Sequence, residues 1–205
     1  MEYGLIAEKL SHSFSKEIHA RLSDYSYELK EIASDELDSF MTKKEFKAIN
    51  VTIPYKSRVI PYLDFIDSAA EKIGAVNTVV NKNGKLYGFN TDYLGMKALI
   101  FKNGIEIKDK KVLILGSGGT SKTAFAVSKA LGAKRIYTVS RKKSADSITY
   151  DEAYEKHNDA QIIINTTPCG MYPKINGCAV DVSKFTFIEG AIDAVYNPLS
   201  TEFVL

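Results

Sequence analysis

Residues 112–123 read VLILGSGGTSKT, and this stretch decides the fold of the C-terminal half of the chain. The apolar run Val112–Leu115 is typical of a parallel strand buried on both faces. Glycines follow at positions 116, 118 and 119, and a helix is expected over Thr120–Leu131. Glycines at such a turn let the backbone approach a pyrophosphate closely at the N-terminus of the following helix.

The segments around this turn predict a doubly wound, Rossmann-like sheet. Strands are expected at Arg135–Val139, Ile162–Ile164 and Ala191–Val195, with a short helix near Asp151–His157. Strands that alternate with helices in this way form a parallel sheet with helices on its faces. One face of the helix after the glycine turn is expected to pack on the sheet. This face consists of Ala124, Val127, Ala130 and Leu131.

Two kinds of nucleotide site fit the glycine-rich turn. The letters GSGGTSKT differ by one residue from a P-loop, in which a glycine would stand at Ser121. No later strand ends in an Asp that could hold magnesium. The third glycine of a dinucleotide site is absent from this sequence, which has Lys122 or Thr123 near that position. The order of strand, turn and helix nevertheless fits a dinucleotide site. We therefore expect a dinucleotide site and keep nucleotide hydrolysis as the minor alternative.

The residues after the second strand of this unit favour NADP over NAD. An NAD site usually places an acidic residue there to bind the ribose hydroxyls, whereas this sequence has Ser140, Arg141, Lys142 and Lys143. Cationic side chains suit a 2′-phosphate, and the arginine can also stack on the adenine. The alternative is a solvated basic loop with no ligand.

The N-terminal half predicts a separate α/β domain. Asn83 and Gly84 lie between two apolar runs, which is a strong signal for a hairpin. The expected elements are strand Tyr3–Ile6, helix Ser13–Leu22, strand Ser26–Ile32, helix Ser34–Met41 capped by Ser34, strand Lys47–Ile53, a helix beginning at Pro54, strands Ala75–Asn81 and Lys85–Phe89, and helix Thr91–Phe101. We expect a substrate-binding domain over 1–104 and an abbreviated Rossmann-like domain over 105–205.

The composition favours a small-molecule partner. The formal net charge is +2, and no basic block large enough for a nucleic-acid backbone stands out. Cys169 and Cys178 are expected to be reduced, packed residues without a metal. The N-terminus has neither a signal-peptide core nor a membrane span, so a cytoplasmic location is expected, with the chain as a monomer or a homodimer.

Several separated segments together resemble the shikimate dehydrogenase family. The resemblance covers nearly the whole chain, and its segments stand in the same order as in the family. They are His12–Ser15, Asn50–Lys56, Gly74–Thr78, Asn90–Asp92, Gly116–Thr120, Ser140–Arg141, Asn165–Met171 and Asp193–Pro198. The resemblance implies NADPH-dependent reduction of 3-dehydroshikimate to shikimate, a step of aromatic amino acid biosynthesis.

The resemblance also implies roles for individual residues. Ser13, Ser15 and Thr52 would hold the substrate carboxylate. Lys56, Asn77 and Asp92 would hold the ring hydroxyls, with Lys56 and Asp92 as the catalytic pair. The segment with Tyr196 would face the substrate. The cofactor would be bound by Gly116, Ser117, Gly118, Gly119, Thr120, Ser140, Arg141, Lys142, Thr166 and Ala194.

Each of these residues also has a purely structural interpretation. Lys56 could be an exposed lysine in a first helical turn, Asp92 an acid that favours the helix dipole, and Asn77 a turn residue. His12 is expected to be a structural hydrogen-bonding residue, and Met171 and Tyr196 could be packing residues. The joint occurrence of the segments favours the functional interpretation.

The sequence departs from the family pattern in three places. Family members usually continue past the segment at Asp193–Pro198 with helices that supply a glutamine, and this sequence ends at Leu205. The stretch between Arg141 and Asn165 is short, and Lys16 replaces a proline. Three functions therefore stay open: an active reductase, a weakly active or inactive shikimate/NADP-binding module, and a quinate/shikimate dehydrogenase.

Overall fold

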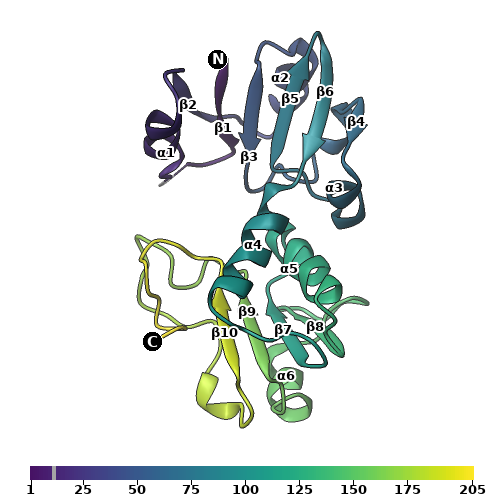
Figure 1. The fold of residues 1–205 in the computed structure, drawn as a ribbon, viewed down its shortest axis with the longest axis vertical. Coiled ribbons are helices and arrows are strands. Elements are labelled where there is room, and N and C mark those ends of the chain that lie inside the picture. Colours follow the sequence, from purple (N-terminus) through teal and green to yellow (C-terminus); the bar gives the residue numbers. More distant parts are fainter. Residues whose placement is uncertain (11–12) are drawn as a thin grey trace. The chain divides into compact units, whose positions relative to one another are not determined.

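The computed structural model describes residues 1–10 and 13–205. The chain divides into two compact units, Met1–Asp92 and Tyr93–Leu205 (Figure 1). Each unit has one sheet; the first has one cluster of buried hydrophobic residues and the second has two. The mixed α/β architecture confirms the expected fold class.

The division between the units falls inside a helix, α4 (Thr91–Lys102), and not near residue 105 as the sequence suggested. The cause is packing, because Met96 and Ile100 of this helix are buried in the core of the second unit. The Asn103-Gly104 pair marks the end of the helix. The two compact units, however, separate within the helix, at the point where its side chains begin to pack against the second unit.

The first unit is built on a six-stranded mixed sheet with the strand order β2-β1-β3-β5-β6-β4. Strand β1 runs parallel to β2 and β3, and β5 runs antiparallel to β3 and β6. The strands are β1 (Tyr3–Ala7), β2 (Tyr27–Glu31), β3 (Ala48–Val51), β4 (Phe65–Ile66), β5 (Thr78–Lys82) and β6 (Lys85–Phe89). The helices are α1 (Ser15–Leu22), α2 (Leu37–Lys43), the 3₁₀ turn η1 (Ile60–Tyr62) and α3 (Ser68–Ile73).

The expected hairpin is present between β5 and β6. Asn83 and Gly84 have φ values of 54° and 81°, as a two-residue turn between twisted strands requires. The Gly84 N–H donates to the Asn81 side chain at 2.8 Å. The hairpin fixes the register in which Thr78 pairs with Phe89 at the far end of the two strands.

Two helix predictions in this unit were wrong in detail. No helix begins at Pro54; residues 53–59 form turns, because the Lys56 carbonyl accepts from the distant Val76 N–H at 2.7 Å instead of serving a helical ladder. Ser34 does not cap α2, because its hydroxyl accepts from Arg58, and the helix begins three residues later at Leu37.

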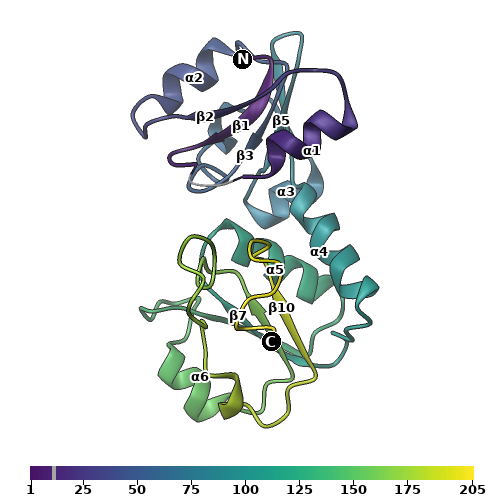
Figure 2. The ribbon, with the colours of Figure 1, turned by 90° about the vertical axis from the view of Figure 1, so that its left-hand side faces the viewer.

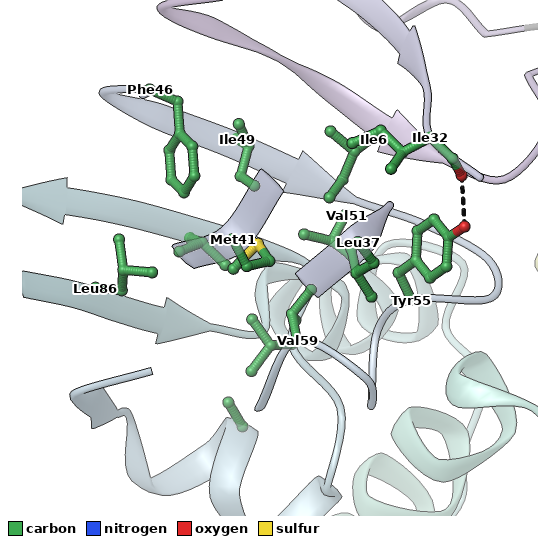
Figure 3. Packing of buried hydrophobic residues seen from close by; sticks show 13 residues of the cluster. Ile6, Ile32, Leu37, Met41, Phe46, Ile49, Val51, Tyr55, Val59 and Leu86 are labelled. Carbon is green, nitrogen blue, oxygen red and sulfur yellow. Dashed lines mark hydrogen bonds between the residues drawn. The ribbon is translucent and has the colours of Figure 1, made fainter. Parts of the chain in front are cut away.

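Tyr55 belongs to the first core and lies at one end of it, beside Ile32 and Leu37 (Figure 3). The Tyr55 side chain is fully buried, and its hydroxyl donates to the Ile32 carbonyl at 2.5 Å. The following residue is Lys56, so the ring anchors the backbone from which the lysine side chain projects.

The second unit is a four-stranded parallel sheet with the order β10-β9-β7-β8, which confirms the Rossmann-like prediction. The chain passes from β7 to β8 on one side and then crosses to β9 on the other (Figure 1). Figure 2 shows the same unit from another direction, with β7 and β10 labelled. The elements are β7 (Lys111–Leu115), α5 (Gly119–Ala130), β8 (Arg135–Val139), α6 (Tyr150–Lys156), β9 (Ile162–Asn165), the 3₁₀ turn η2 (Val182–Lys184) and β10 (Gly190–Asp193).

Helix α5 buries most of the face that was expected. Ala124 and Val127 are buried and Leu131 packs against the same cluster, but Ala130 is exposed. The buried face is completed by the small polar residues Ser121, Thr123 and Ser128, which let the helix lie close to the sheet.

The two cysteines are free, as expected, but only Cys169 is partly buried, and Cys178 is exposed rather than packed. Burial raises the pKa of the Cys169 thiol, and the neighbouring Cys178 adds to this rise. In the described ranges, no cluster of three acidic, His or Cys side chains suits a metal ion. None of the helices described is long and apolar enough to cross a membrane.

We predict that Tyr55→Phe lowers the free energy of unfolding by about 1–3 kcal/mol, because it leaves the buried Ile32 carbonyl without its donor. Chemical denaturation followed by circular dichroism measures the change. Tyr87→Phe is the control, because that ring stacks on Phe65 at the β6 side of the same sheet. Equal stability of the Tyr55 variant and wild type would contradict the prediction.

Candidate active site

Lys56 and Asp92 form a close ion pair in the first unit. The Lys56 ammonium lies 2.6 Å from Asp92 Oδ2. The lysine side chain is only 12% exposed, whereas the aspartate side chain is 35% exposed. The pair therefore combines a sheltered cation with a carboxylate that solvent can still reach.

Asn77 fixes the second oxygen of Asp92. Its side-chain amide donates to Asp92 Oδ1 at 2.8 Å and to the Thr91 hydroxyl at 2.9 Å. The Asn77 side-chain oxygen accepts from the Thr91 backbone N–H at 2.9 Å. Asn77 itself is 8% exposed, so the Asn77 end of each of these bonds is buried. Both oxygens of Asp92 are thereby oriented, one by Asn77 and one by Lys56.

A series of hydrogen bonds continues from Asn77 towards α1. The Thr78 hydroxyl donates to the Asn77 side-chain oxygen at 3.1 Å, and the Asn50 amide donates to the Thr78 hydroxyl at 3.1 Å. The Tyr27 hydroxyl donates to the Asn50 side-chain oxygen at 2.6 Å. Burial raises the pKa of Tyr27, Tyr25 adds to the rise, and a hydrogen bond with Ser15 opposes it. The raised pKa keeps the phenol protonated, so it remains a donor.

Ser13 and Ser15 lie together at the start of α1. The Ser13 hydroxyl donates to the Ser15 hydroxyl at 3.0 Å and accepts from the Ser15 N–H at 3.1 Å. Thr52 is half-buried just after β3, and its N–H donates to the Ile6 carbonyl at 3.1 Å. His12 lies outside the described residues.

Sheet topology explains why these residues meet. Strands β1, β3 and β6 all run in the same direction, and β5 runs the opposite way. The carboxyl ends of β1, β3 and β6 and the amino end of β5 therefore lie at the same end of the sheet's strands. Ser13 follows β1, Thr52 follows β3, Asp92 follows β6, and Asn77 immediately precedes β5.

Four members of this network were not predicted as site residues. Asn50, Thr78 and Thr91 stood in the segments that carry the family resemblance, and their position at strand ends was the signal that could have found them. Tyr27 stood outside every segment. Its role follows only from the pairing of β2 with β1, which no local pattern specified.

The second unit gathers the expected cofactor residues at the carboxyl edge of its sheet. Gly116–Gly119 follow β7, Ser140–Lys142 follow β8, Thr166 follows β9 and Ala194 follows β10. In open α/β sheets, ligands bind outside this edge, where the strand order reverses. Tyr196 also follows β10 and is 58% exposed.

Gly116 and Gly118 of the turn are glycine for different structural reasons. Gly116 has φ +104°, and a Cβ there would lie 2.9 Å from the Thr166 hydroxyl. Gly118 is the N-cap residue just before α5 and provides no side-chain cap, and a Cβ there would meet nothing within 4 Å. Gly116 is thus required by the fold, whereas Gly118 leaves open space beside the uncapped N–H groups of the helix.

The loop after β8 carries three exposed cationic side chains, and one of them forms an ion pair. Ser140 bonds to the Lys142 carbonyl and lies 2.9 Å from the Ser147 hydroxyl, which folds the loop back on itself. Lys143 is paired with Glu152 at 2.5 Å, and this contact lowers the pKa of Glu152. Arg141 and Lys142 are exposed, and neither makes an ion pair with any residue that the structure describes.

Asn165 and Asp193 have a structural role between β9 and β10. The Asn165 amide donates to Asp193 Oδ1 at 2.9 Å, and the Thr201 hydroxyl donates to Asp193 Oδ2 at 2.5 Å. Asn165 is fully buried and Thr201 is 2% exposed. These bonds attach the segment after β10 to the strand ends and so fix the backbone around Thr166 and Ala194.

Comparison with known proteins identifies the family of this chain. The model of the shikimate dehydrogenase substrate-binding domain matches residues 5–79. A shikimate dehydrogenase (NADP(+)) of Clostridium beijerinckii is 42% identical over 217 residues, which cover 98% of this chain and 80% of that protein. The chain belongs to the shikimate dehydrogenase family.

Solved structures extend this assignment to the fold. Shikimate dehydrogenase 1 from Peptoclostridium difficile superposes with a TM-score of 0.88 at 37% identity, covering 99% of this chain and 81% of that one. Shikimate 5-dehydrogenase from Thermus thermophilus, in complex with NADP(H) and shikimate, gives 0.84 at 26% identity, covering 100% and 82%. The shikimate dehydrogenase fold is therefore present in both units.

We predict that Gly116→Ala lowers the free energy of unfolding by about 1–3 kcal/mol, because alanine is strained at positive φ and its Cβ would press on Thr166. Gly118→Ala is the matched control and changes the stability by less than about 0.5 kcal/mol. Denaturant titration of both variants measures this. Equal effects of the two substitutions would show that the turn is not constrained as described.

Proposed function

We propose that this chain is an oxidoreductase that reduces 3-dehydroshikimate to shikimate with NADPH, as a step of aromatic amino acid biosynthesis. The observation that carries the proposal is the Lys56–Asp92 pair, held by Asn77 at one sheet edge. The curated relatives are named as NADP-dependent shikimate dehydrogenases, and they support the same activity.

The polar groups of the first unit suit a hydroxylated carboxylate. We assign Ser13, Ser15 and Thr52 to the carboxylate, because hydroxyl groups can donate to its oxygens. Lys56, Asn77 and Asp92 are assigned to the ring hydroxyls and the reacting carbonyl. Both groups follow or precede strands of one sheet on the same side, and the hydrogen bonds from Asn77 reach Tyr27 through Thr78 and Asn50. This arrangement supports a single substrate spanning both groups.

Lys56 is the proton donor in this proposal. Reduction of a ketone places negative charge on its oxygen, and a protonated ammonium both stabilises that charge and supplies the proton. Asp92 orients the ammonium through its 2.6 Å contact, and Asn77 prevents the carboxylate from turning away. In the reverse reaction, the neutral amine of Lys56 accepts the proton of the alcohol.

The second unit fits NADP. Its nicotinamide would supply the hydride when bound. The open space at Gly118 and the uncapped start of α5 suit the pyrophosphate, with Gly116, Ser117, Gly119 and Thr120 completing the turn. We assign Ser140, Arg141 and Lys142 to the 2′-phosphate side of the adenosine, and Thr166 and Ala194 to the remaining part of the cofactor. Tyr196 is assigned to the substrate. The unpaired cations favour NADP over NAD.

A binding module without catalysis is the less favoured function. A protein that only bound the substrate would need hydrogen-bonding groups but would have no need of a sheltered cation fixed against a carboxylate. The intact arrangement of Lys56, Asp92 and Asn77 therefore favours turnover.

We further propose a cytoplasmic location, consistent with the two free thiols, and a monomeric or homodimeric state. The absorbance of reduced nicotinamide tests the proposed function, with purified protein, shikimate and either NADP or NAD, and then with quinate in place of shikimate. The proposal expects faster reduction of NADP than of NAD, and shikimate as the better substrate. Binding of shikimate and NADP without reduction would instead establish a binding module.

We predict that Lys56→Ala lowers kcat by roughly 10²–10⁴-fold, the usual range for loss of a general acid or base. Binding of NADP, measured by calorimetry, is expected to stay unchanged, because the lysine belongs to the other unit. Lys72→Ala is a control at an exposed lysine of α3. A Lys56→Ala enzyme with turnover near wild type would refute the assignment of the proton donor.

We predict that Arg141→Asp weakens binding of NADPH by about tenfold or more and binding of NADH by less than about threefold, because only NADPH carries the 2′-phosphate. Arg135→Asp, the same substitution at the opposite end of β8, is the control. Fluorescence titration gives the dissociation constants. If both cofactors lost the same affinity in the Arg141 variant, the case for 2′-phosphate recognition at this residue would fail.

A further inference from the structure

We propose that His19 is a positioning residue, which mounts helix α1 on the sheet by stacking on Tyr27 and thereby sets the affinity for the substrate carboxylate. The inference rests on the proposed function, because it concerns the serines at the start of α1. His19 itself lies outside the groups assigned to the substrate.

Helix α1 lacks the usual means of attachment to a sheet. None of its residues is buried, and the apolar residues Ile18 and Leu22 are 52% and 73% exposed. A helix of eight residues is not stable by itself in water, so tertiary contacts have to hold it. The helix starts at Ser15, and any loosening of α1 displaces the serine hydroxyls.

The contacts that hold α1 converge on His19. The imidazole stacks on the Tyr27 ring with centroids 3.8 Å apart and an interplanar angle of 12°. Its Nδ1 lies 2.6 Å from the Tyr25 hydroxyl. Tyr25 in turn stacks on Tyr3 of β1 at 4.3 Å. One side chain thus connects α1 to β2 directly and to β1 through Tyr25, and Figure 1 shows α1 beside β2.

The hydroxyl end of Tyr27 lies near Ser15, at the start of α1. Its hydroxyl is bonded to Asn50 at 2.6 Å, and the nearby Ser15 side chain opposes the rise that burial causes in the pKa of Tyr27. The ring is 5% exposed and sits at the first position of β2, so it is a rigid support. His19 on its face and Ser15 at its hydroxyl together fix both the helix and its first residue relative to the sheet.

Loss of the stack therefore affects substrate binding more than chemistry. Lys56, Asp92 and Asn77 are carried by other elements and keep their mutual contacts when α1 loosens. We predict that His19→Ala raises the dissociation constant of shikimate by about tenfold and raises KM for shikimate by a similar factor. The value of kcat is expected to change by less than about threefold. His19→Phe restores the stack and is expected to bind shikimate within about threefold of wild type.

The test measures the shikimate dissociation constant by calorimetry, together with kcat and KM for both substrates. His157→Ala is a matched control, because His157 stacks on Tyr137 at 4.0 Å in the second unit. It removes a comparable stack away from the serines and is expected to leave shikimate binding unchanged. His19→Leu is a second test of the lost stack if the alanine variant does not fold.

Each outcome decides the proposal. Weakened shikimate binding in His19→Ala, rescued by His19→Phe and absent in His157→Ala, supports it. Unchanged binding, a loss confined to kcat, or a phenylalanine variant as weak as the alanine variant overturns it. Wild-type protein that binds no shikimate overturns the proposed function itself, whereas normal wild-type binding with an unaffected His19→Ala overturns only this inference.

Discussion

The side-chain amide of Asn77 is the interaction on which the first unit's site depends. It donates to Asp92, accepts from Thr91 and Thr78, and is sheltered from water. Buried amides that lose a partner cost about 1–3 kcal/mol each, so the arrangement resists rotation of any one member. The orientation of Asp92, and through it that of Lys56, follows from this one residue.

Parallel strands explain why such contacts form in both units. The carboxyl ends of parallel strands lie at one edge, so residues distant in sequence meet there without long side chains. In the first unit this edge collects hydroxyl, amide, carboxylate and ammonium groups. In the second it collects a glycine turn, an uncapped helix start and three exposed cations. The chemical difference between the edges matches a hydroxylated substrate on one and a phosphorylated cofactor on the other.

Local sequence was sufficient wherever local chemistry determines structure. The hairpin at Asn83 and Gly84 and the strand-turn-helix at residues 112–123 could be predicted because turn residues and apolar runs specify them. Lys56, Asp92 and Asn77 were found from separated segments. The structure brings those three side chains together, which no single segment implied.

Tertiary contacts decided the rest. The helix expected at Pro54 does not form because the Lys56 carbonyl bonds to Val76, and the division of the chain falls within α4 because that helix packs into the second core. His19 and Tyr27 had no local signal, since their contact depends on how α1 meets β2. Such features require the sheet order, which a single sequence does not reveal.

The central claim is that Lys56 and Asp92 act as one unit, and kcat of the double variant Lys56→Ala/Asp92→Ala tests it most directly. If the aspartate works only by orienting the lysine, removing both leaves kcat within about threefold of Lys56→Ala alone. The account is contradicted if kcat of the double variant lies below that of Lys56→Ala by the whole factor that Asp92→Ala alone causes in the wild type. The two residues would then act independently.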